Sequence, residues 1–300
     1  MRYPFRSQLI RWVRPRADAL VYASDAYVNL KSTMNDMSDH LIGFSFDPQG
    51  DEDLALLELL RFILPREWSP GRFVRLGRES DGGYVMDCDL DVHSAVSIGV
   101  GHDISWDQAL ANAGVRMCLF DHTVSGLPSK LPNSEFHRLG LGPKSEGHLR
   151  SLDDLVALAR LPVGTRNILK IDVEGAEWDA LASCDASVLM PFSQIAVELH
   201  NLDAICDAQR AETIKEALGV LTTNHIPVHM HANNYGRLFR ASSYWFVDTL
   251  EMLFVSIGAE QKPPLSRKLF SQLDSPCDPR VSDISLANAV EAIRLLEANA

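Results

Sequence analysis

The sequence has few of the residues that build disulfide frameworks, membrane spans or nucleic-acid interfaces. Its five cysteines are an odd number among 300 residues and include no Cys-x-x-Cys pair, which is typical of reduced thiols in a cytoplasmic protein. No apolar run reaches the roughly 18 residues that a transmembrane helix needs. Lysine and arginine number 28 against 40 acidic residues, for a net charge of −12. This balance argues against nucleic acid as the main partner, because phosphate binding depends on clustered cations.

Positive charge is instead concentrated at the N-terminus, ahead of the first acid, Asp18. Arginines are interleaved there with apolar and aromatic side chains, and the lack of an uninterrupted apolar segment disfavours a secretory signal. Two interpretations stay open. We favour a helix packed on the domain or on a neighbouring subunit of a homo-oligomer, and the alternative is a helix that lies on a membrane surface as a peripheral contact.

The remaining composition fits one large domain with an addition at each end. Hydrophobic residues make up 46% of the chain, enough for a sizeable core. We predict an N-terminal helical extension over residues 1–70, which includes a strong helix at 51–64 with acids in its first turn. A ligand-binding domain follows over residues 71–260. Residues 261–300 are predicted to form a proline-containing linker and a C-terminal helix at 282–297.

Strand and helix patterns alternate through the central domain, which favours a mostly parallel sheet with helices on both faces. Two short strands around a turn at 81–83 are predicted to precede it. Strands are predicted at 95–100, 116–121, 135–139, 167–172 and 194–200, then at 226–232 and 243–255. Helices are predicted at 105–113, 151–160, 175–184 and 207–224.

A glycine turn follows the strand at 95–100. In an open α/β sheet a nucleotide-like ligand binds at such a turn, and Gly99 and Gly101 allow its close approach. Asp121 ends the next strand twenty positions later (121 − 101), where a carboxylate can hold a ribose diol or cap a helix. The dinucleotide motif is incomplete, because Ile104 stands where its third glycine belongs, and there is no Walker-type lysine. S-adenosylmethionine (SAM) therefore fits better than NAD, with Asp103 as a candidate partner for its ammonium group.

Acidic residues and a histidine follow the later strands. Asp172, Glu174 and Glu177 gather where the strand at 167–172 ends, which is more acid than helix capping requires. Glu198 and His200 share one face of the next strand. Burying such a pair is costly unless both are partnered or act on a ligand.

A histidine-rich segment, His229-Met-His-Ala-Asn-Asn234, lies further along, and its two histidines share a face. We expect the second, His231, to meet Asp172, Glu198 and His200 at one end of the sheet. Oxygen and imidazole ligands of this kind suit Mg²⁺ or Mn²⁺. We predict a divalent ion on Asp172, Glu198 and His231, with Asp172, Glu198 and His200 as the catalytic residues and His200 as a base or orienting group.

Taken together, the motifs resemble a known family. Residues 172–181, Asp-Val-Glu-Gly-Ala-Glu-Trp-Asp-Ala-Leu, are similar to the signature of FkbM-type SAM-dependent methyltransferases. Further segments resemble a methyltransferase-like subgroup of that family, and the matches keep their order across about residues 72–256. These segments are Asp81-Gly-Gly-Tyr84, Ser97-Ile-Gly-Val-Gly-His-Asp103, Phe120-Asp121 and His229-Met-His-Ala-Asn-Asn234.

The resemblance implies a class I methyltransferase (Rossmann-like) fold that methylates a hydroxyl of a small-molecule or glycan acceptor, often a sugar or natural product. It places SAM over the glycine turn and adds a loop at 81–84, for which a plain hairpin is the other interpretation. The predicted cofactor-binding residues are Asp81, Gly82, Gly83, Tyr84, Gly99, Gly101, Asp103, Asp121 and His122. His122 stands where the subgroup often has proline, and the Asp-x-Gly-Ala-Asn motif of many FkbM proteins is absent.

Two other classes of function compete with this one. The first is a non-catalytic or regulatory SAM-fold protein that binds a partner through the basic N-terminal helix. The second is an NAD-dependent sugar enzyme, which the missing third glycine disfavours.

Overall fold

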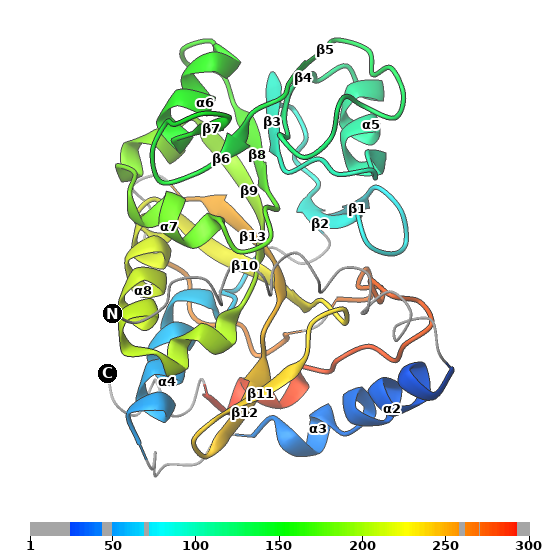
Figure 1. Cartoon of the computed structure of the whole chain (residues 1–300), viewed down its shortest axis with the longest axis vertical. Coiled ribbons are helices and arrows are strands. Elements are labelled where there is room, and N and C mark those ends of the chain that lie inside the picture. Colours follow the sequence, from blue (N-terminus) through cyan, green and yellow to red (C-terminus); the bar gives the residue numbers. More distant parts are fainter. Residues whose placement is uncertain (1–24, 44–49, 69–71, 258–261, 270, 293–300) are drawn as a thin grey trace, which may run out of the picture.

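The computed structural model describes residues 25–43, 50–68, 72–257, 262–269 and 271–292 (Figure 1). The predicted basic helix at the N-terminus lies outside these residues. Within the part of the chain that is described, no helix combines the length and the apolar composition that a membrane span requires.

A seven-stranded sheet forms the centre of the molecule, in the order β10-β13-β9-β8-β3-β4-β5 (Figure 1). Its strands are β3 (Ser94–Ile98), β4 (Arg116–Phe120), β5 (Ser134–His137), β8 (Asn167–Ile171), β9 (Phe192–Leu199), β10 (His225–Ala232) and β13 (Leu250–Ser256). Strands β5, β4, β3, β8 and β9 are parallel. Strand β13 runs antiparallel between β9 and β10. The predicted mostly parallel α/β sheet is confirmed, and it is compatible with a Rossmann-like fold.

Helices cover both faces of the sheet. Successive strand side chains point in opposite directions, so each strand contributes to a core on each face. Met117 and Leu119 of β4 join a core with one helix and one hairpin, whereas Cys118 and Phe120 join a larger core with four helices. The first layer holds α5 (Ser105–Asn112), β1 (Phe73–Leu76) and β2 (Tyr84–Asp87). The second holds α4 (Asp51–Ile63), α6 (Leu152–Ala159), α7 (Glu177–Ala182) and α8 (Ala208–Thr222).

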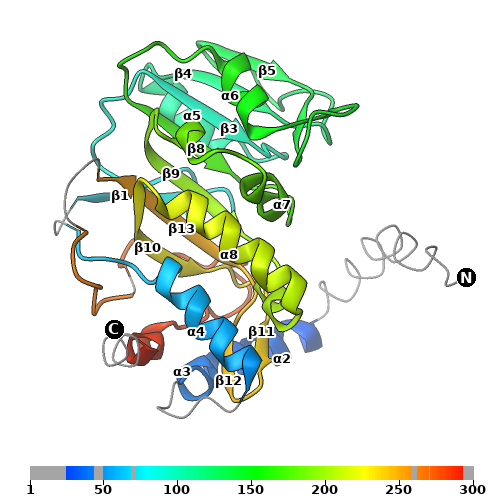
Figure 2. The ribbon, with the colours of Figure 1, turned by 90° about the vertical axis from the view of Figure 1, so that its left-hand side faces the viewer.

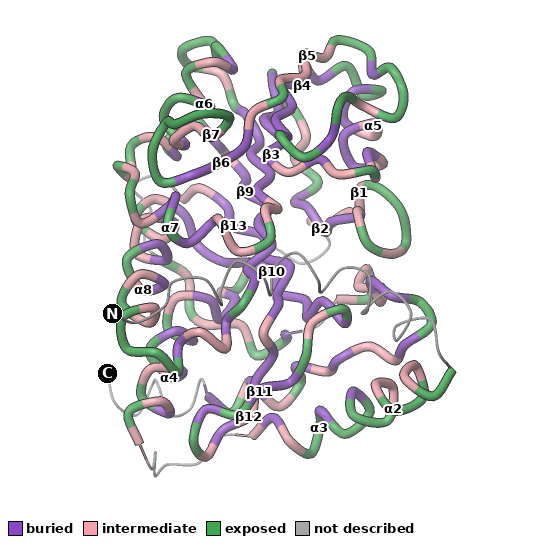
Figure 3. Tube along the Cα trace, in the orientation of Figure 1, coloured by how far each residue is buried: buried purple, intermediate pink, exposed green. Residues whose placement is uncertain are grey.

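Figure 2 shows α4 and α8 side by side in front of this sheet, and Glu58 and Lys215 form an ion pair between them. Helix α4, which was predicted as part of the N-terminal extension, places Leu56, Leu60 and Ile63 in the larger core. The central strands are buried along most of their length (Figure 3). The apolar pattern of α4 therefore serves the same core as the sheet.

The strand predicted over 243–255 is two strands. Strand β12 (Tyr244–Val247) forms a hairpin with β11 (Leu238–Ala241), and only β13 joins the main sheet. Asp248 lies at the break, where its side chain accepts the backbone N–H of Arg237 at 2.7 Å and so holds the chain in its turn. The remaining described elements are α2 (Asp25–Asp36), α3 (Ser38–Leu41), β6 (Gly140–Leu141), β7 (Leu149–Arg150), η1 (Ala186–Leu189), η2 (Leu202–Cys206) and η3 (Ala287–Ala289).

The helix predicted over 282–297 is wrong in its first part. Residues 282–286 are not helical, and η3 begins at Ala287. We call residues 271–286 the C-terminal strap. Its Asp283 contacts His231, and its backbone carbonyls at Asp278 and Val281 accept the side-chain amide of Asn234. These contacts to β10 and the turn after it outweigh the local helical pattern.

Candidate active site

A cavity of about 810 Å³ opens at the edge of the sheet where the parallel strands end. Gly99, Asp121, Asp172 and His200 are the first residues after β3, β4, β8 and β9, and all four line the cavity. Strand β13 runs in the opposite direction, so Thr249 enters the cavity just before that strand begins. Ligands of open α/β sheets bind at this edge.

The two glycines of the turn after β3 have different surroundings. Gly99 adopts φ +80°, and a Cβ atom there would lie 1.6 Å from the backbone carbonyl oxygen of Asp172, so this glycine lets β3 and β8 end side by side. Gly101 adopts φ +59°, and its Cβ position has nothing within 4 Å. The open space in front of Gly101 is therefore where a ligand can approach the backbone.

Asp121 accepts four hydrogen bonds, two of which hold it against this turn. Its Oδ2 accepts the N–H groups of Val100 at 3.0 Å and Gly101 at 2.8 Å, and its Oδ1 accepts the N–H and hydroxyl of Thr123 at 2.7 and 2.6 Å. Burial alone would raise the pKa of this carboxyl, but the hydrogen bonds outweigh burial and lower it. A carboxylate has about four lone-pair sites. Thr123 must therefore give way if Asp121 is to accept a ribose diol.

Residues 81–84 form the turn and first strand residue of the β1–β2 hairpin. Of these four, Asp81 and Gly82 line the cavity. A Cβ atom on Gly83 would lie 2.0 Å from a carbonyl oxygen of the same hairpin, so Gly83 is required by the turn itself. Tyr84 is buried, and its hydroxyl donates to Oδ2 of Asp172 at 2.9 Å. The motif thus contributes two cavity residues and a buried support for Asp172.

Asp103 and His122 both line the cavity. Asp103 forms an ion pair with Arg78 at 2.5 Å and accepts the N–H of Ser105 at 2.8 Å, so its charge is already balanced by the protein. His122 is exposed and packs over Gly140, where a Cβ atom would lie 2.2 Å from the imidazole Nδ1. Both predicted cofactor residues reach the cavity, but Asp103 would have to exchange Arg78 for a ligand's ammonium group.

The structure brings His200 together with four carboxylates. Its Nε2 lies 3.6 Å from Glu198, 3.8 Å from Glu174 and 3.9 Å from Asp172, while its Nδ1 lies 3.3 Å from Glu177. Burial alone would lower the pKa of this imidazole, but Glu177, Glu198 and Asp172 raise it to about 10. Without a ligand, His200 is therefore protonated near neutral pH and is a poor base.

The loops that carry these groups hold strained backbone. Glu174 adopts φ +56° and Asn201 adopts φ +54°, in a region that costs a non-glycine residue about 1–3 kcal/mol and is frequent at functional sites. Between them, a Cβ atom on Gly175 would lie 2.5 Å from Nδ2 of Asn201. The Glu174 side chain is 89% exposed. These turns after β8 and β9 present Glu174 to the cavity mouth.

His231 does not join the other two predicted metal ligands. Its Nδ1 lies 2.8 Å from Glu251 and its Nε2 lies 3.0 Å from Asp283, and it is not among the residues that line the cavity. Strand β13 separates it from β9, because Glu251 is paired with Glu198 on one side and with His231 on the other. The predicted set of Asp172, Glu198 and His231 therefore does not come together.

Two groups of described residues are close enough for their ligand atoms to share an ion. One is Asp172, Glu174 and His200 in the cavity, and the other is a separate set that contains His231. Sequence analysis also missed Lys170, a buried lysine in β8 whose Nζ lies 3.4 Å from the carbonyl oxygen of Gly99 and 3.9 Å from Asp172. A lysine inside an apolar strand was the available signal.

The fold and the cavity define a mixed α/β protein with a ligand site at the carboxyl edge of its sheet. No family model matches the chain, and no curated protein matches it. A structure from work on the conversion of a disulfide bond into a thioacetal group during echinomycin biosynthesis is 11% identical, with a TM-score of 0.31 over 58% of this chain and 79% of that one. The structure of EvdMO1 is 13% identical, with a TM-score of 0.27 over 55% of this chain and 37% of its own. At these values neither structure supports an activity for this chain.

Proposed function

We propose that this protein is a SAM-dependent O-methyltransferase with a class I methyltransferase fold. The observation that carries the proposal is the cavity itself, where an open glycine turn and a carboxylate–imidazole cluster meet at one sheet edge. The seven-stranded, mostly parallel sheet is compatible with this fold. The motif resemblance supports the chemistry.

The cavity residues fit a cationic nucleoside cofactor. Gly101 leaves room at the backbone, and Phe120 and Leu141 supply apolar wall against which an adenine ring can pack. Asp121 is the candidate for the ribose once Thr123 releases it. The acidic lining favours a sulfonium cofactor, since a cleft of one sign of charge concentrates ions of the other sign. When bound, SAM supplies an activated methyl group.

We place a divalent ion, Mg²⁺ or Mn²⁺, on Asp172, Glu174 and His200. Oxygen and imidazole donors suit these ions, and when bound such an ion lowers the pKa of a ligated hydroxyl. The chain orients the donors: Tyr84 hydrogen bonds to Asp172, and the buried Glu177 faces the far nitrogen of His200. A carboxylate behind a ligating histidine is a common support in metal sites.

The acceptor is proposed to lie on the other side of this cluster, toward β10 and β13. The residues there offer amide, hydroxyl and carboxylate groups: Asn233, Tyr235, Asp248 and Thr249. These groups suit a hydroxyl-rich sugar, glycan or natural product, and the acids disfavour an anionic one. The cavity walls align the hydroxyl with the methyl group, which is the positional part of catalysis.

The test is transfer of labelled methyl from SAM to sugar nucleotides, cell-envelope glycans and glycosylated natural products. Calorimetry with S-adenosylhomocysteine tests the cofactor separately. Asp121→Ala should weaken binding at least tenfold, whereas Thr123→Ala should not weaken it, because it frees one of the two acceptor sites on Oδ1 of Asp121. Full activity of rigorously metal-free enzyme would remove the ion from the proposal. Binding without transfer to any acceptor would favour a regulatory SAM-fold protein, and absence of binding would overturn the cofactor.

A further inference from the structure

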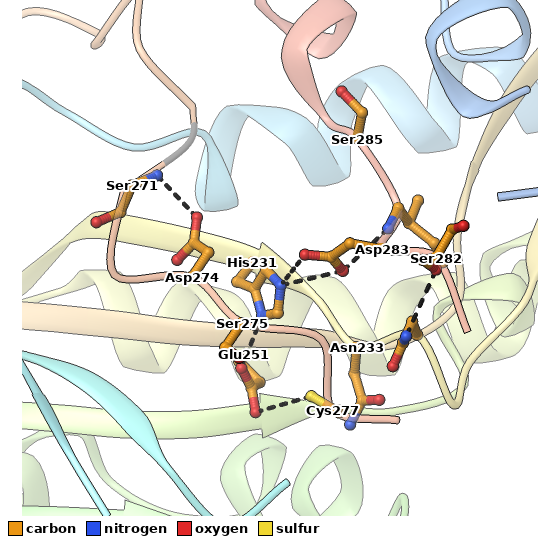
Figure 4. Close-up of polar contacts among 12 residues, drawn as sticks. His231, Asn233, Glu251, Ser271, Asp274, Ser275, Cys277, Ser282, Asp283 and Ser285 are labelled. Atoms are coloured by element: carbon orange, nitrogen blue, oxygen red, sulfur yellow. Dashed lines mark hydrogen bonds and ion pairs between the residues drawn. The ribbon is translucent and has the colours of Figure 1, made fainter. Parts of the chain in front are cut away.

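A second polar cluster lies in the interior, under the C-terminal strap. It consists of His231 on β10, Glu251 on β13 and Cys277 on the strap (Figure 4). Their exposed fractions are 5%, 4% and 1%. These three residues, which we call the strap cluster, do not line the active-site cavity.

The strap cluster brings three metal-ligand types to one point. The Nδ1 of His231 lies 2.8 Å from one carboxylate oxygen of Glu251, and the Sγ of Cys277 lies 3.4 Å from the other. One ligand atom from each residue lies within 4.8 Å of the other two. Imidazole, carboxylate and thiolate are the ligands of protein-bound zinc, and a cysteine among them selects zinc over magnesium.

A second feature independently points to a metal, because His231 is held from behind. Its other nitrogen, Nε2, faces the carboxylate of Asp283 at 3.0 Å, on the side away from Cys277 (Figure 4). Asp283 in turn accepts the N–H of Ile284. Histidines that ligate a metal almost always donate the other ring N–H to a carboxylate, a carbonyl or water, which fixes the tautomer and the ring orientation.

The charges around the strap cluster also favour a cation. Glu251 lies directly opposite Glu198 in the β13–β9 register, and both are buried. Like charges in that position repel, and the His200 imidazole, 3.6 Å from Glu198, offsets this repulsion only on the Glu198 side. The single imidazole of His231 is shared by the buried Glu251 and by Asp283, whose side chain is 35% exposed, so it does not balance the charge of Glu251 alone.

We propose that His231, Glu251 and Cys277 form a zinc site that fastens the C-terminal strap to β10 and β13. Binding of Zn²⁺ displaces the thiol proton of Cys277 and any proton on Nδ1 of His231, and both leave to solvent. Three protein ligands leave the fourth tetrahedral position for water or another small ligand. The site is separate from the proposed methyltransferase cavity and does not rest on that function.

The test uses the full-length protein. Elemental analysis after purification should find about one zinc per chain, and after chelation a cobalt titration should give one Co²⁺ per chain with thiolate absorption, apart from any Co²⁺ in the cavity. Bound Co²⁺ should show the thiolate-to-cobalt absorption that reports a cysteine ligand. Cys277→Ser should lose that band, and Cys118→Ser, a matched buried thiol in β4, should keep it. Asp283→Asn should weaken zinc binding about 10- to 100-fold.

Asp172→Asn separates this site from the cavity, because it should leave the thiolate–cobalt band unchanged. Should Cys277→Ser fail to fold, the wild-type band and the Asp283→Asn affinity still decide the proposal. A metal-free protein that shows no thiolate band with Co²⁺ and no rise in thermal stability with Zn²⁺ would overturn it. So would a thiolate band that survives Cys277→Ser.

Discussion

Two polar clusters on neighbouring strands contain similar residues but differ in how far the chain covers them. The cavity cluster, Asp172, Glu174, Glu198 and His200, lies mostly in residues that follow β8 and β9. The strap cluster starts inside β10 and β13 and is completed by Cys277, 26 residues after Glu251 (277 − 251). Residues just beyond a parallel strand reach the ligand edge. Residues inside the reversed pair are covered by the chain itself.

The difference in cover decides what each cluster can do. Glu174 is 89% exposed at its side chain, whereas Glu251 is 4% exposed. Cavity groups can therefore exchange their partners for a cofactor, an ion or an acceptor. Strap-cluster groups are fixed by protein contacts on both sides, so removing one of them should mainly lower the free energy of unfolding. The comparison predicts that variants in the two clusters separate activity from folding.

Asp172→Asn should give the largest effect. We expect methyl transfer to fall about 10²- to 10⁴-fold, the range for loss of a positioned acid–base or ligand group. Stability should change little, because asparagine can still accept the hydroxyl of Tyr84. Steady-state kinetics and chemical denaturation measure the two quantities. Asp153→Asn, an exposed acid on α6, is the control, and equal losses of activity in both variants would contradict the assignment.

His231→Ala should have the opposite profile. Removing one partner of a buried charge pair costs about 3–5 kcal/mol, because the other charge stays buried, and here that charge is Glu251, while the more exposed Asp283 also loses its partner. Urea unfolding measures the loss, with the exposed His148 as the alanine control. Unchanged stability of His231→Ala would remove the distinction between the two clusters.

The sequence predicted the alternating fold well because strand and helix periods are local. It placed Gly99, Asp121, Asp172 and His200 at strand ends, and these four do meet at one edge. It could not show that β13 lies between β9 and β10, because strand order depends on pairing between distant segments. That missing fact put His231 in the wrong group.

The helix predicted over 282–297 is wrong in its first part for a related reason. Of the strap, only residues 282–286 were predicted to be helical, but Asp283 bonds to His231 there instead. Tertiary contacts commonly override local propensity in this way. The filled acceptor sites of Asp121 and the protonated state of His200 were also beyond sequence analysis, since both depend on neighbours within about 4 Å in space.

Asp81 should give the cavity a pH-dependent preference for cationic ligands. Burial and the nearby Asp172 and Glu251 raise its pKa to about 6, against the opposing effect of Lys170, with Asp103 a smaller contribution that raises it. Because the carboxylate forms as pH rises through 6, binding of SAM relative to S-adenosylhomocysteine, which lacks the sulfonium charge, should strengthen by about fivefold, roughly 1 kcal/mol. Calorimetry between pH 5 and 7.5 measures the ratio. In Asp81→Asn this ratio should no longer change with pH. A change near pH 6 that persists in that variant belongs to another titrating group.

Glu174→Gly should have the smallest effect on folding stability. It should still distinguish the cavity from the rest of the fold, because only the cavity variant should lose activity. Glycine relieves a left-handed residue by about 1–2 kcal/mol but adds about 0.4–1 kcal/mol of chain entropy to the unfolded state. The expected net gain is about 0.5 kcal/mol in the free energy of unfolding. Arg160→Gly, at φ +50° where α6 ends, should give the same gain with full activity.

Glu174→Gly and Glu174→Gln should both lose activity, because each removes the carboxylate and only the first removes the strain. If Glu174→Gln keeps full activity, the strained turn has no role in presenting a ligand group, and the divalent ion must be held without Glu174.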